Sequence, residues 1–363
     1  MLLYIHVPFC RSKCAYCSFS SQVLPKGRVG AYMLKKYLAA LIGEMRMQTD
    51  ILDKTQVRSI FFGGGTPSLL PGRAITGILE ETRKCFDVSP GAEITLEANP
   101  ESLLDGDCLA EARKAGINRL SIGMQSFEDP VLGLLGRRHD SWQAENAFSA
   151  ARAAGFSNIN LDLIWALPGR EGRPQSQMRW LSTLRRAVDL QPEHISTYCL
   201  SLEDGPPLGK LLEQGEISLP GEREQSSMYL AGADYLEGQG YMQYEISNFA
   251  RMGFACLHNK GYWQGEDYLG IGPAAVSTMG ARRRTNPAHL KIWTEMVAKG
   301  DSSPWEELDM LTRLKEILML RLRTSAGLSL GEWRKRSGRP FLTDFAAQVA
   351  LLQQIGLART RRG

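Results

Sequence analysis

Short apolar runs rich in β-branched and aromatic residues alternate with longer amphipathic stretches through the N-terminal part of the chain. This alternation is typical of parallel βα units. We expect six strands, at residues 2–7, 58–62, 93–98, 119–124, 158–164 and 194–200. Helical stretches fall between them and begin at residues 31, 73, 106, 141 and 176. Because six units are too few to close an eight-stranded barrel, the pattern predicts an α/β fold with an open, partial (β/α)6 barrel of the TIM-like type.

The C-terminal part of the chain has only helical periodicity. An amphipathic stretch covers residues 307–324, a break follows at Gly327, and two further helical stretches cover residues 329–338 and 341–356. We therefore predict a barrel, a connecting region and a small helical domain, at residues 1–240, 241–300 and 301–363.

Polar or glycine-rich residues follow the first five predicted strands. In a parallel barrel the carboxyl ends of the strands meet at one rim, where reactive groups collect. Packing alone does not predict such a series, so the sequence indicates a functional site at this rim. In chain order the series consists of a cysteine loop at residues 10–17, a glycine run at 63–68, Glu97, Gln125 and Asp162.

Composition describes an ordinary globular protein. The 363 residues include 43 Lys and Arg against 39 Asp and Glu, a net charge of +4 that does not indicate nucleic-acid binding. No stretch approaches the roughly 18 apolar residues of a membrane helix, and the N-terminus lacks the pattern of a signal sequence. We expect a cytoplasmic protein with at most peripheral membrane contact. Thiols stay reduced there, so the seven cysteines favour metal binding or catalysis over disulfides.

Three cysteines, Cys10, Cys14 and Cys17, are spaced C-x3-C-x2-C in "CRSKCAYC". A structural zinc site takes four ligands, and no second cysteine pair follows, although His6 stays open as a fourth ligand. A [4Fe-4S] cluster held by three thiolates leaves one iron open to a substrate. The glycines at 63–65 let backbone approach a ligand closely, and they lack the ending of a nucleotide P-loop.

The cysteine loop with Tyr16 before its last cysteine, followed by "GGGTP" after the second strand, resembles the radical S-adenosylmethionine (SAM) superfamily. The resemblance implies a [4Fe-4S] cluster on the three cysteines, an electron donor, and SAM chelating the open iron before its cleavage to methionine and a 5'-deoxyadenosyl radical. It also implies SAM contacts, carried over by similarity to Tyr4, Tyr16, Gly64, Gly65, Thr66, Glu97, Gln125, Arg137, Asp162, Ser196 and Val276.

The segments "YIHVPFC", "FGGGTPS", "SIGMQSF" and "NLDLIWALPG" resemble the group that contains the oxygen-independent coproporphyrinogen III oxidase and the heme chaperone HemW. The oxidase carries a fourth cysteine where this chain has Phe19, and a long segment ahead of its cluster loop that we expect to be absent here. The segment "CLHNKGYW" at 256–263 matches the HNxxYW signature of the HemW group. The C-terminal stretches resemble the winged-helix-like domain that ends these proteins, without its wing and final helix.

Without the resemblance, this HNxxYW segment has two interpretations. His258 supplies an imidazole that can ligate iron, and Tyr262 and Trp263 supply aromatic faces that can stack on a porphyrin. The alternative is an Asn/His turn whose aromatic side chains pack into the core. The resemblance favours heme binding, with His258 as the candidate iron ligand.

The resemblance implies a heme chaperone of radical SAM type that binds a [4Fe-4S] cluster, SAM and heme, and delivers heme to hemoproteins such as respiratory enzymes. No catalytic residue is assigned, and an exposed cluster at an open rim is compatible with a homodimer. Two alternatives stay open: oxidative decarboxylation of coproporphyrinogen III and a zinc-stabilised binding module. The winged-helix likeness raises DNA binding, but no basic recognition helix stands out.

Overall fold

Six parallel strands in chain order form the centre of the fold. The computed structural model describes residues 1–49, 55–105, 107–202 and 205–361. Each strand pairs with the next one along the chain. The strands are β1 (Leu2–Val7), β4 (Val57–Gly64), β5 (Val88–Ala98), β6 (Arg119–Gln125), β7 (Ile159–Trp165) and β9 (His194–Cys199). All six strands predicted from the sequence are present, and the open, partial barrel is confirmed.

Short strands extend both ends of this sheet. Within the described residues the full sheet has 12 strands and does not close, with the order β11-β12-β9-β7-β6-β5-β4-β1-β13-β14-β15-β16. The extensions are β11 (Met242–Gln243), β12 (Asn248–Ala250), β13 (Tyr268–Ile271), β14 (Val276–Met279), β15 (Arg282–Thr285) and β16 (Glu306–Glu307). Strands of two to four residues are too short to show a periodicity, so the sequence pattern did not reveal them. Most lie in the predicted connecting region, whose boundaries stay a prediction.

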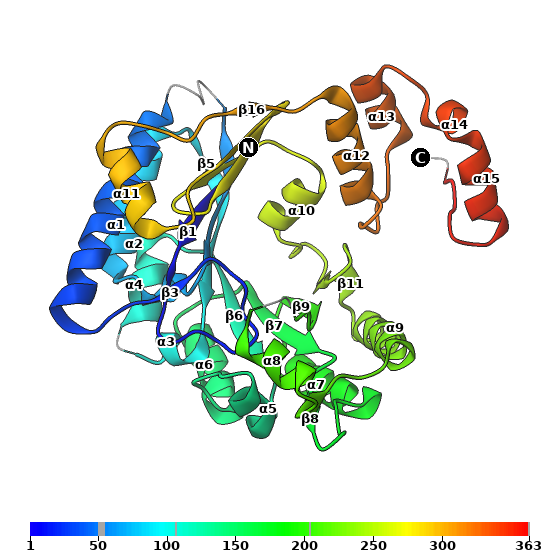
Figure 1. Cartoon of the computed structure of the whole chain (residues 1–363), viewed down its shortest axis with the longest axis horizontal. Helices are drawn as coiled ribbons and strands as arrows, with labels where there is room; N and C mark the ends of the chain where they lie inside the picture. Colours follow the sequence, from blue (N-terminus) through cyan, green and yellow to red (C-terminus); the bar gives the residue numbers. More distant parts are fainter. Residues whose placement is uncertain (50–54, 106, 203–204, 362–363) are drawn as a thin grey trace.

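Helices cover the outer face of the barrel sheet (Figure 1). Five of them match the predicted helical stretches, although the predicted start at residue 106 lies outside the described residues. Two are capped by their own sequence: Asp140 and Gln143 form a capping box at α6, and Ser176 accepts from the Arg179 N–H at α7. The helices are α1 (Gly27–Met47), α2 (Gly72–Cys85), α3 (Pro100–Leu103), α4 (Cys108–Ala115), α5 (Asp129–Leu134), α6 (Ser141–Ala153), α7 (Gln177–Asp189), α8 (Pro207–Glu213) and α9 (Glu222–Gly238).

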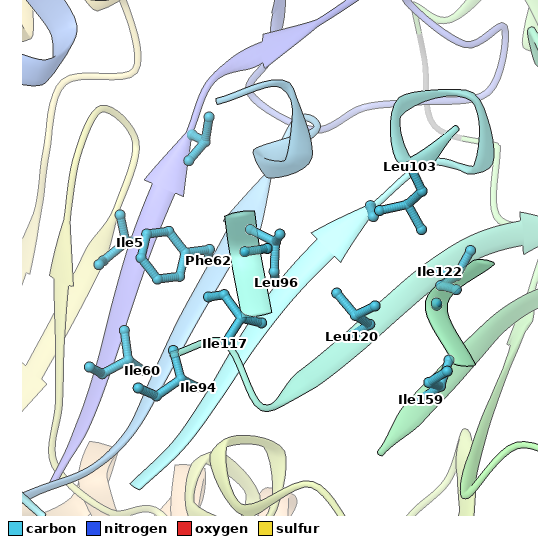
Figure 2. Packing of buried hydrophobic residues seen from close by; sticks show 14 of the residues in the cluster. Ile5, Ile60, Phe62, Ile94, Leu96, Leu103, Ile117, Leu120, Ile122 and Ile159 are labelled. Carbon is cyan, nitrogen blue, oxygen red and sulfur yellow. The ribbon is translucent and has the colours of Figure 1, made fainter. Parts of the chain in front are cut away.

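Alternate residues of the strands face opposite sides of the sheet. Ile60 and Phe62 of β4 and Leu120 of β6 belong to the main hydrophobic core, between the sheet and its helices (Figure 2). Their neighbours Phe61 and Ser121 instead line a cavity on the inner side of the barrel. The strands therefore carry an apolar outer face and a largely polar inner face, and the inner face is where chemistry can occur.

The remaining helices follow the barrel. They are α10 (Leu257–Trp263), α11 (Leu290–Ala298), α12 (Met310–Arg321), α13 (Leu330–Ser337), α14 (Phe341–Asp344) and α15 (Ala346–Gln354). Figure 1 shows α12 beside α10, with α13 to α15 farther from the barrel. The sequence pattern predicted one helix at 341–356, but the backbone leaves helical geometry at Phe345, where its ring packs on Phe341 with centroids 4.7 Å apart. In the described part of the chain, no helix is long and apolar enough to cross a membrane.

Candidate functional site

Cys10 ends the short strand β2 (Phe9–Cys10), which follows β1, and Cys14 and Cys17 lie on the loop that continues from it; all three are partly exposed. Backbone hydrogen bonds hold this loop: the Ala15 N–H donates to Leu135 O at 3.0 Å, and the Cys17 N–H donates to Cys14 O at 3.2 Å. Among the described residues, no three His, Cys, Asp or Glu side chains converge in the manner of a metal site. The three thiols are therefore close together along the chain, but their sulfur atoms do not converge on one point.

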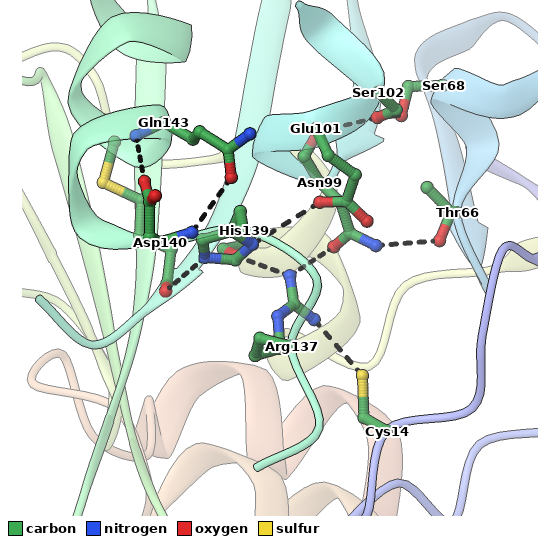
Figure 3. Close-up of polar contacts among 12 residues, drawn as sticks. Cys14, Thr66, Ser68, Asn99, Glu101, Ser102, Arg137, His139, Asp140 and Gln143 are labelled. Atoms are coloured by element: carbon green, nitrogen blue, oxygen red, sulfur yellow. Dashed lines mark hydrogen bonds and ion pairs between the residues drawn. The ribbon is translucent and has the colours of Figure 1, made fainter. Parts of the chain in front are cut away.

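Side chains from two other rim segments contact the sulfur atoms, and a third segment connects them. The Thr66 hydroxyl donates to Cys10 Sγ at 3.6 Å, and Arg137 Nη1 donates to Cys14 Sγ at 3.5 Å. Asn99 connects them, because its Nδ2 donates to Thr66 Oγ1 at 3.0 Å and its Oδ1 accepts from Arg137 Nη2 at 2.6 Å (Figure 3). Donors aimed at sulfur stabilise thiolates, so this donor set fits a cluster bound by the loop.

The glycine run lies directly against the cysteine loop. A Cβ added at Gly65 would stand 2.5 Å from Phe9 O and 3.0 Å from Cys10 Sγ. Gly64 has φ +114, and a Cβ there would lie 2.7 Å from the His6 ring. Only glycine fits at these two positions, which supports the interpretation of "GGGTP" as a segment of close backbone approach.

Two carboxyl groups face the inside of the barrel. Glu97 Oε2 accepts from the Gly64 N–H at 3.2 Å, and Asp162 accepts from Ser121 Oγ and Asn160 Nδ2, both at 2.8 Å. Burial raises the pKa of Glu97 to about 8, and the nearby Asp162 carboxylate adds to the effect. Burial also raises the pKa of Asp162. This part of the barrel therefore holds one carboxyl group, that of Glu97, that can exchange a proton near neutral pH.

The structure divides the predicted SAM contacts into two groups. One group lines a cavity of about 860 Å³ inside the barrel: Tyr4, Gly64, Glu97, Asp162, Ser196 and Val276. The other group lies near the thiols or the end of β6 and is not part of that lining: Tyr16, Gly65, Thr66, Gln125 and Arg137. Tyr16 packs beside the apolar side chains around Leu135, and Gln125 has a left-handed backbone with φ +65 where β6 changes register against β7.

The cavity extends from the cysteine loop to the HNxxYW helix. Phe19 and Ser20, which directly follow the cysteine loop, line it at one end, and Met319 and Leu320 line it on α12. Its volume falls within the roughly 300–1,000 Å³ of small-molecule pockets. The cavity can therefore hold a ligand much larger than a metal ion.

His258, on α10, forms part of the cavity wall. Its Nδ1 lies 3.0 Å from Ser59 Oγ, and its ring packs against Phe61 with centroids 5.0 Å apart. Burial, together with the guanidinium groups of Arg119 and Arg58, lowers the pKa of His258 to about 3. The imidazole is therefore neutral at physiological pH, and no hydrogen bond within the described part of the chain occupies its Nε2.

The two aromatic residues of the HNxxYW segment have different surroundings. Tyr262 lines the cavity, whereas Trp263 is not part of the lining and its indole Nε1 is buried without a hydrogen bond among the described residues. The aromatic face next to His258 comes from Phe61 of β4, which the sequence pattern did not single out. Of the two predicted aromatic side chains, Tyr262 therefore lines the cavity and Trp263 does not.

Glu93 of β5 attaches α10 to the barrel. Its carboxylate accepts from the Cys256 thiol at 3.2 Å, the Leu257 N–H at 3.0 Å and the His258 N–H at 3.1 Å. Burial raises the pKa of the Cys256 thiol to about 12, so this thiol is protonated and donates. Four further polar residues near the site were not predicted from the sequence: Ser59, Glu93, Asn99 and Arg119. Three of them are polar residues at inward positions of the strands, and strand alternation is the signal that could have revealed them.

Comparison with known proteins identifies the family. A sequence model of the radical SAM superfamily matches residues 4–181, and one of the HemN C-terminal domain matches residues 308–362. The heme chaperone HemW of Mycobacterium tuberculosis is 35% identical over 331 residues, which cover 90% of this chain and 83% of that protein. HemW of Bacillus subtilis is 32% identical over 358 residues, which cover 98% and 91%. The chain belongs to the HemW family of radical SAM proteins.

A solved structure supports the fold of this HemW-family chain. Coproporphyrinogen III oxidase (HemN) from Escherichia coli, a radical SAM enzyme, aligns with a TM-score of 0.80 at 26% identity, covering 98% of this chain and 82% of the other. The segment matched to the radical SAM superfamily contains the cysteine loop, the glycine run, Glu97, Arg137 and Asp162. Membership implies a [4Fe-4S] cluster and SAM as cofactors of HemW-family chains.

Proposed function

We propose that this protein is a heme chaperone that binds heme in the barrel cavity and passes it to recipient hemoproteins such as respiratory enzymes. The observation that carries the proposal is a neutral histidine, His258, on the wall of an approximately 860 Å³ cavity in a chain of the HemW family. The relatives from M. tuberculosis and B. subtilis are named heme chaperones, which favours this function over porphyrin oxidation.

His258 has the surroundings of a metal-ligating imidazole. Ligating histidines usually hydrogen-bond through their second nitrogen, which sets the tautomer and the ring orientation. Ser59 Oγ supplies that partner at Nδ1, at 3.0 Å, and Nε2 remains for iron. Phe61, Tyr262 and Met319 supply apolar and aromatic wall for a flat macrocycle. These contacts support His258 as the axial ligand of heme.

At the other end of the cavity, we assign the cluster to Cys10, Cys14 and Cys17. When bound, a cluster with three protein ligands supplies an open iron position for SAM. Arg137 stands at Cys14 Sγ with a guanidinium that can pair with the carboxylate of SAM, and Glu97 offers a carboxyl for its amino or ribose groups. The other predicted contacts surround this point, at Tyr4, Tyr16, Gly64, Gly65, Thr66, Gln125, Asp162, Ser196 and Val276.

Phe19 bears on the alternative function. It stands where the coproporphyrinogen oxidase group has a fourth cysteine, and its side chain, 68% exposed, lines the cavity. An apolar ring at this position favours a binding role.

All seven cysteines lack disulfide bonds, which agrees with a reducing compartment such as the cytoplasm. The proposal also includes an electron donor for the cluster, and a homodimer is compatible with its exposed loop.

The deciding experiment is an anaerobic heme titration of the cluster-reconstituted protein, followed by its visible spectrum. Saturable binding is expected in the parent, with affinity at least tenfold weaker in His258→Ala. The exposed His289 provides a matched control, and His289→Ala should bind as the parent does. Binding no stronger than that of an unrelated protein would refute the proposal, and formation of protoporphyrinogen with SAM and a reductant would then favour the oxidase.

A second measurement tests the cluster assignment. Cys14→Ala should abolish retention of iron and sulfide after anaerobic reconstitution, because a thiolate ligand is lost. Cys199 is an exposed cysteine outside the loop, so Cys199→Ala should retain both. Equal iron and sulfide in the two variants would refute the assignment, and stoichiometric zinc would favour the binding module.

A further inference from the structure

Arg119 is a buried cation that has no side-chain hydrogen bond or salt bridge among the described residues. It opens β6 on the inward face of the barrel, and only 2% of its surface is exposed. Its Nε is buried and makes no hydrogen bond within the described residues. Nor does any carboxylate oxygen described by the structure lie within 4.0 Å of its guanidinium. Arg119 nevertheless lines the cavity, so its charge faces a space that a ligand can fill.

The carboxylates of Glu93 and Asp162, whose charges raise the pKa of Arg119, make their hydrogen bonds elsewhere. Glu93 accepts from the Cys256 thiol and from the Leu257 and His258 N–H groups at the start of α10. Asp162 accepts from Ser121 Oγ and Asn160 Nδ2. Both carboxylates are therefore already hydrogen-bonded, and neither pairs with Arg119 at salt-bridge distance.

Burying an unpaired charge is strongly unfavourable, and buried polar groups without partners are rare in native proteins. Such a group is explained when a ligand completes its interactions. A guanidinium prefers planar anions, above all carboxylates, which it can bind through two parallel hydrogen bonds. The unpartnered Arg119 thus indicates a carboxylate-binding subsite in the inner part of the cavity.

We infer that Arg119 binds a propionate carboxylate of heme. The inference rests on the proposed function, because it places the propionate in the cavity whose wall carries His258 as the iron ligand. Heme is an apolar macrocycle whose anionic groups are its two propionates, so one buried cation beside a histidine matches its chemistry. SAM also has a carboxylate, but Arg137 already offers a guanidinium beside the cluster thiols.

The test compares three ligands on the parent, Arg119→Gln and Arg119→Lys. The ligands are heme, heme dimethyl ester, whose propionates carry no charge, and SAM. Arg119→Gln should weaken heme binding by about 10- to 100-fold, the range for one charged hydrogen-bonded contact, and Arg119→Lys should restore part of it. The ester should bind parent and Arg119→Gln equally. SAM affinity should not change.

Each outcome is decisive. Equal weakening of heme and its ester in Arg119→Gln would show that Arg119 only shapes the cavity and would overturn the inference. A loss of SAM affinity with unchanged heme affinity would assign the carboxylate to SAM and would also overturn it. In both cases the parent still binds heme, so the proposed function survives. A parent that binds no heme would overturn the inference together with the proposed function.

A stability measurement separates binding from folding. Burial opposes the Arg119 charge, but the nearby acidic groups, Glu93 and Asp162 among them, raise the pKa of Arg119 and offset that cost, so Arg119→Gln and the parent are first compared without ligand. Heme should then raise the unfolding temperature of the parent more than that of the variant. An equal rise in the parent and the variant would show that heme does not use the Arg119 charge and would contradict the inference.

Discussion

Replacing Glu93 by Gln tests how the HNxxYW helix is held in the cavity wall. In the parent, the two carboxylate oxygens accept from the Leu257 N–H at 3.0 Å and from the His258 N–H at 3.1 Å, and Cys256 Sγ lies 3.2 Å away. A glutamine keeps one acceptor oxygen and turns an NH2 group toward one of these donors. One charge-assisted hydrogen bond is therefore lost.

The size of the effect follows from that single lost bond. Hydrogen bonds to charged groups contribute about 1.5–3 kcal/mol, so local opening of α10 should become easier by about 2 kcal/mol. Since each 1.4 kcal/mol is a factor of ten, amide exchange in residues 257–263 should accelerate by about 30-fold. Exchange in the central strands of the barrel should not change, because their hydrogen bonds do not involve the Glu93 side chain.

Hydrogen–deuterium exchange followed by mass spectrometry provides the assay, with peptides that cover α10 and β6. Glu80 is exposed on α2, so Glu80→Gln is the matched control and should exchange as the parent does. Unchanged exchange over α10 in Glu93→Gln would refute the reasoning. Packing of Gly261 against Leu2, where an added Cβ would lie 2.8 Å from the leucine side chain, would then be what holds the helix.

Three further predictions concern the two ends of the cavity. Ser59→Ala removes the partner of His258 Nδ1 and should weaken heme binding by about tenfold in an anaerobic titration. Glu97→Gln removes a carboxyl whose pKa rises from 4.5 to about 8 on folding through burial and the Asp162 carboxylate. Between those values the folded state binds more protons than the unfolded state, so rising pH destabilises the parent, and the variant should lose less stability. Gly65→Ala places a methyl group 2.5 Å from a backbone oxygen and should lower iron retention by the cysteine loop.

Matched measurements check these predictions. Ser302 is exposed, and Ser302→Ala should leave the heme titration unchanged. Unfolding of the parent and Glu97→Gln should be followed from about pH 5 to about pH 8, and equal pH dependence in both would contradict the pKa assignment. A Cβ added at Gly77 of α2 meets no atom within 4 Å, so Gly77→Ala should retain iron. Iron retention in Gly65→Ala equal to that in Gly77→Ala would contradict the predicted clash.

The sequence by itself determined the six barrel strands, the helices between them and the cluster loop, because their signals are local. Strand alternation placed the six barrel strands, and the spacing of Cys10, Cys14 and Cys17 within eight residues indicated the chemistry of the rim. Glycine positions also act locally: Gly65 is required by the backbone that directly faces it. Periodicity and spacing depend on neighbours along the chain, so one sequence is enough to detect them.

Only the tertiary structure decided how distant residues meet. Ser59 and His258 are 199 positions apart, yet they share a hydrogen bond, and Asn99 joins Thr66 to Arg137. Such contacts depend on sheet register and on the packing of α10 against β4, which no local pattern specifies. The absence of a partner for a buried charge is likewise visible only once every neighbour is in place. The sequence thus named the chemistry at the rim, and the fold decided which side chains share the cavity.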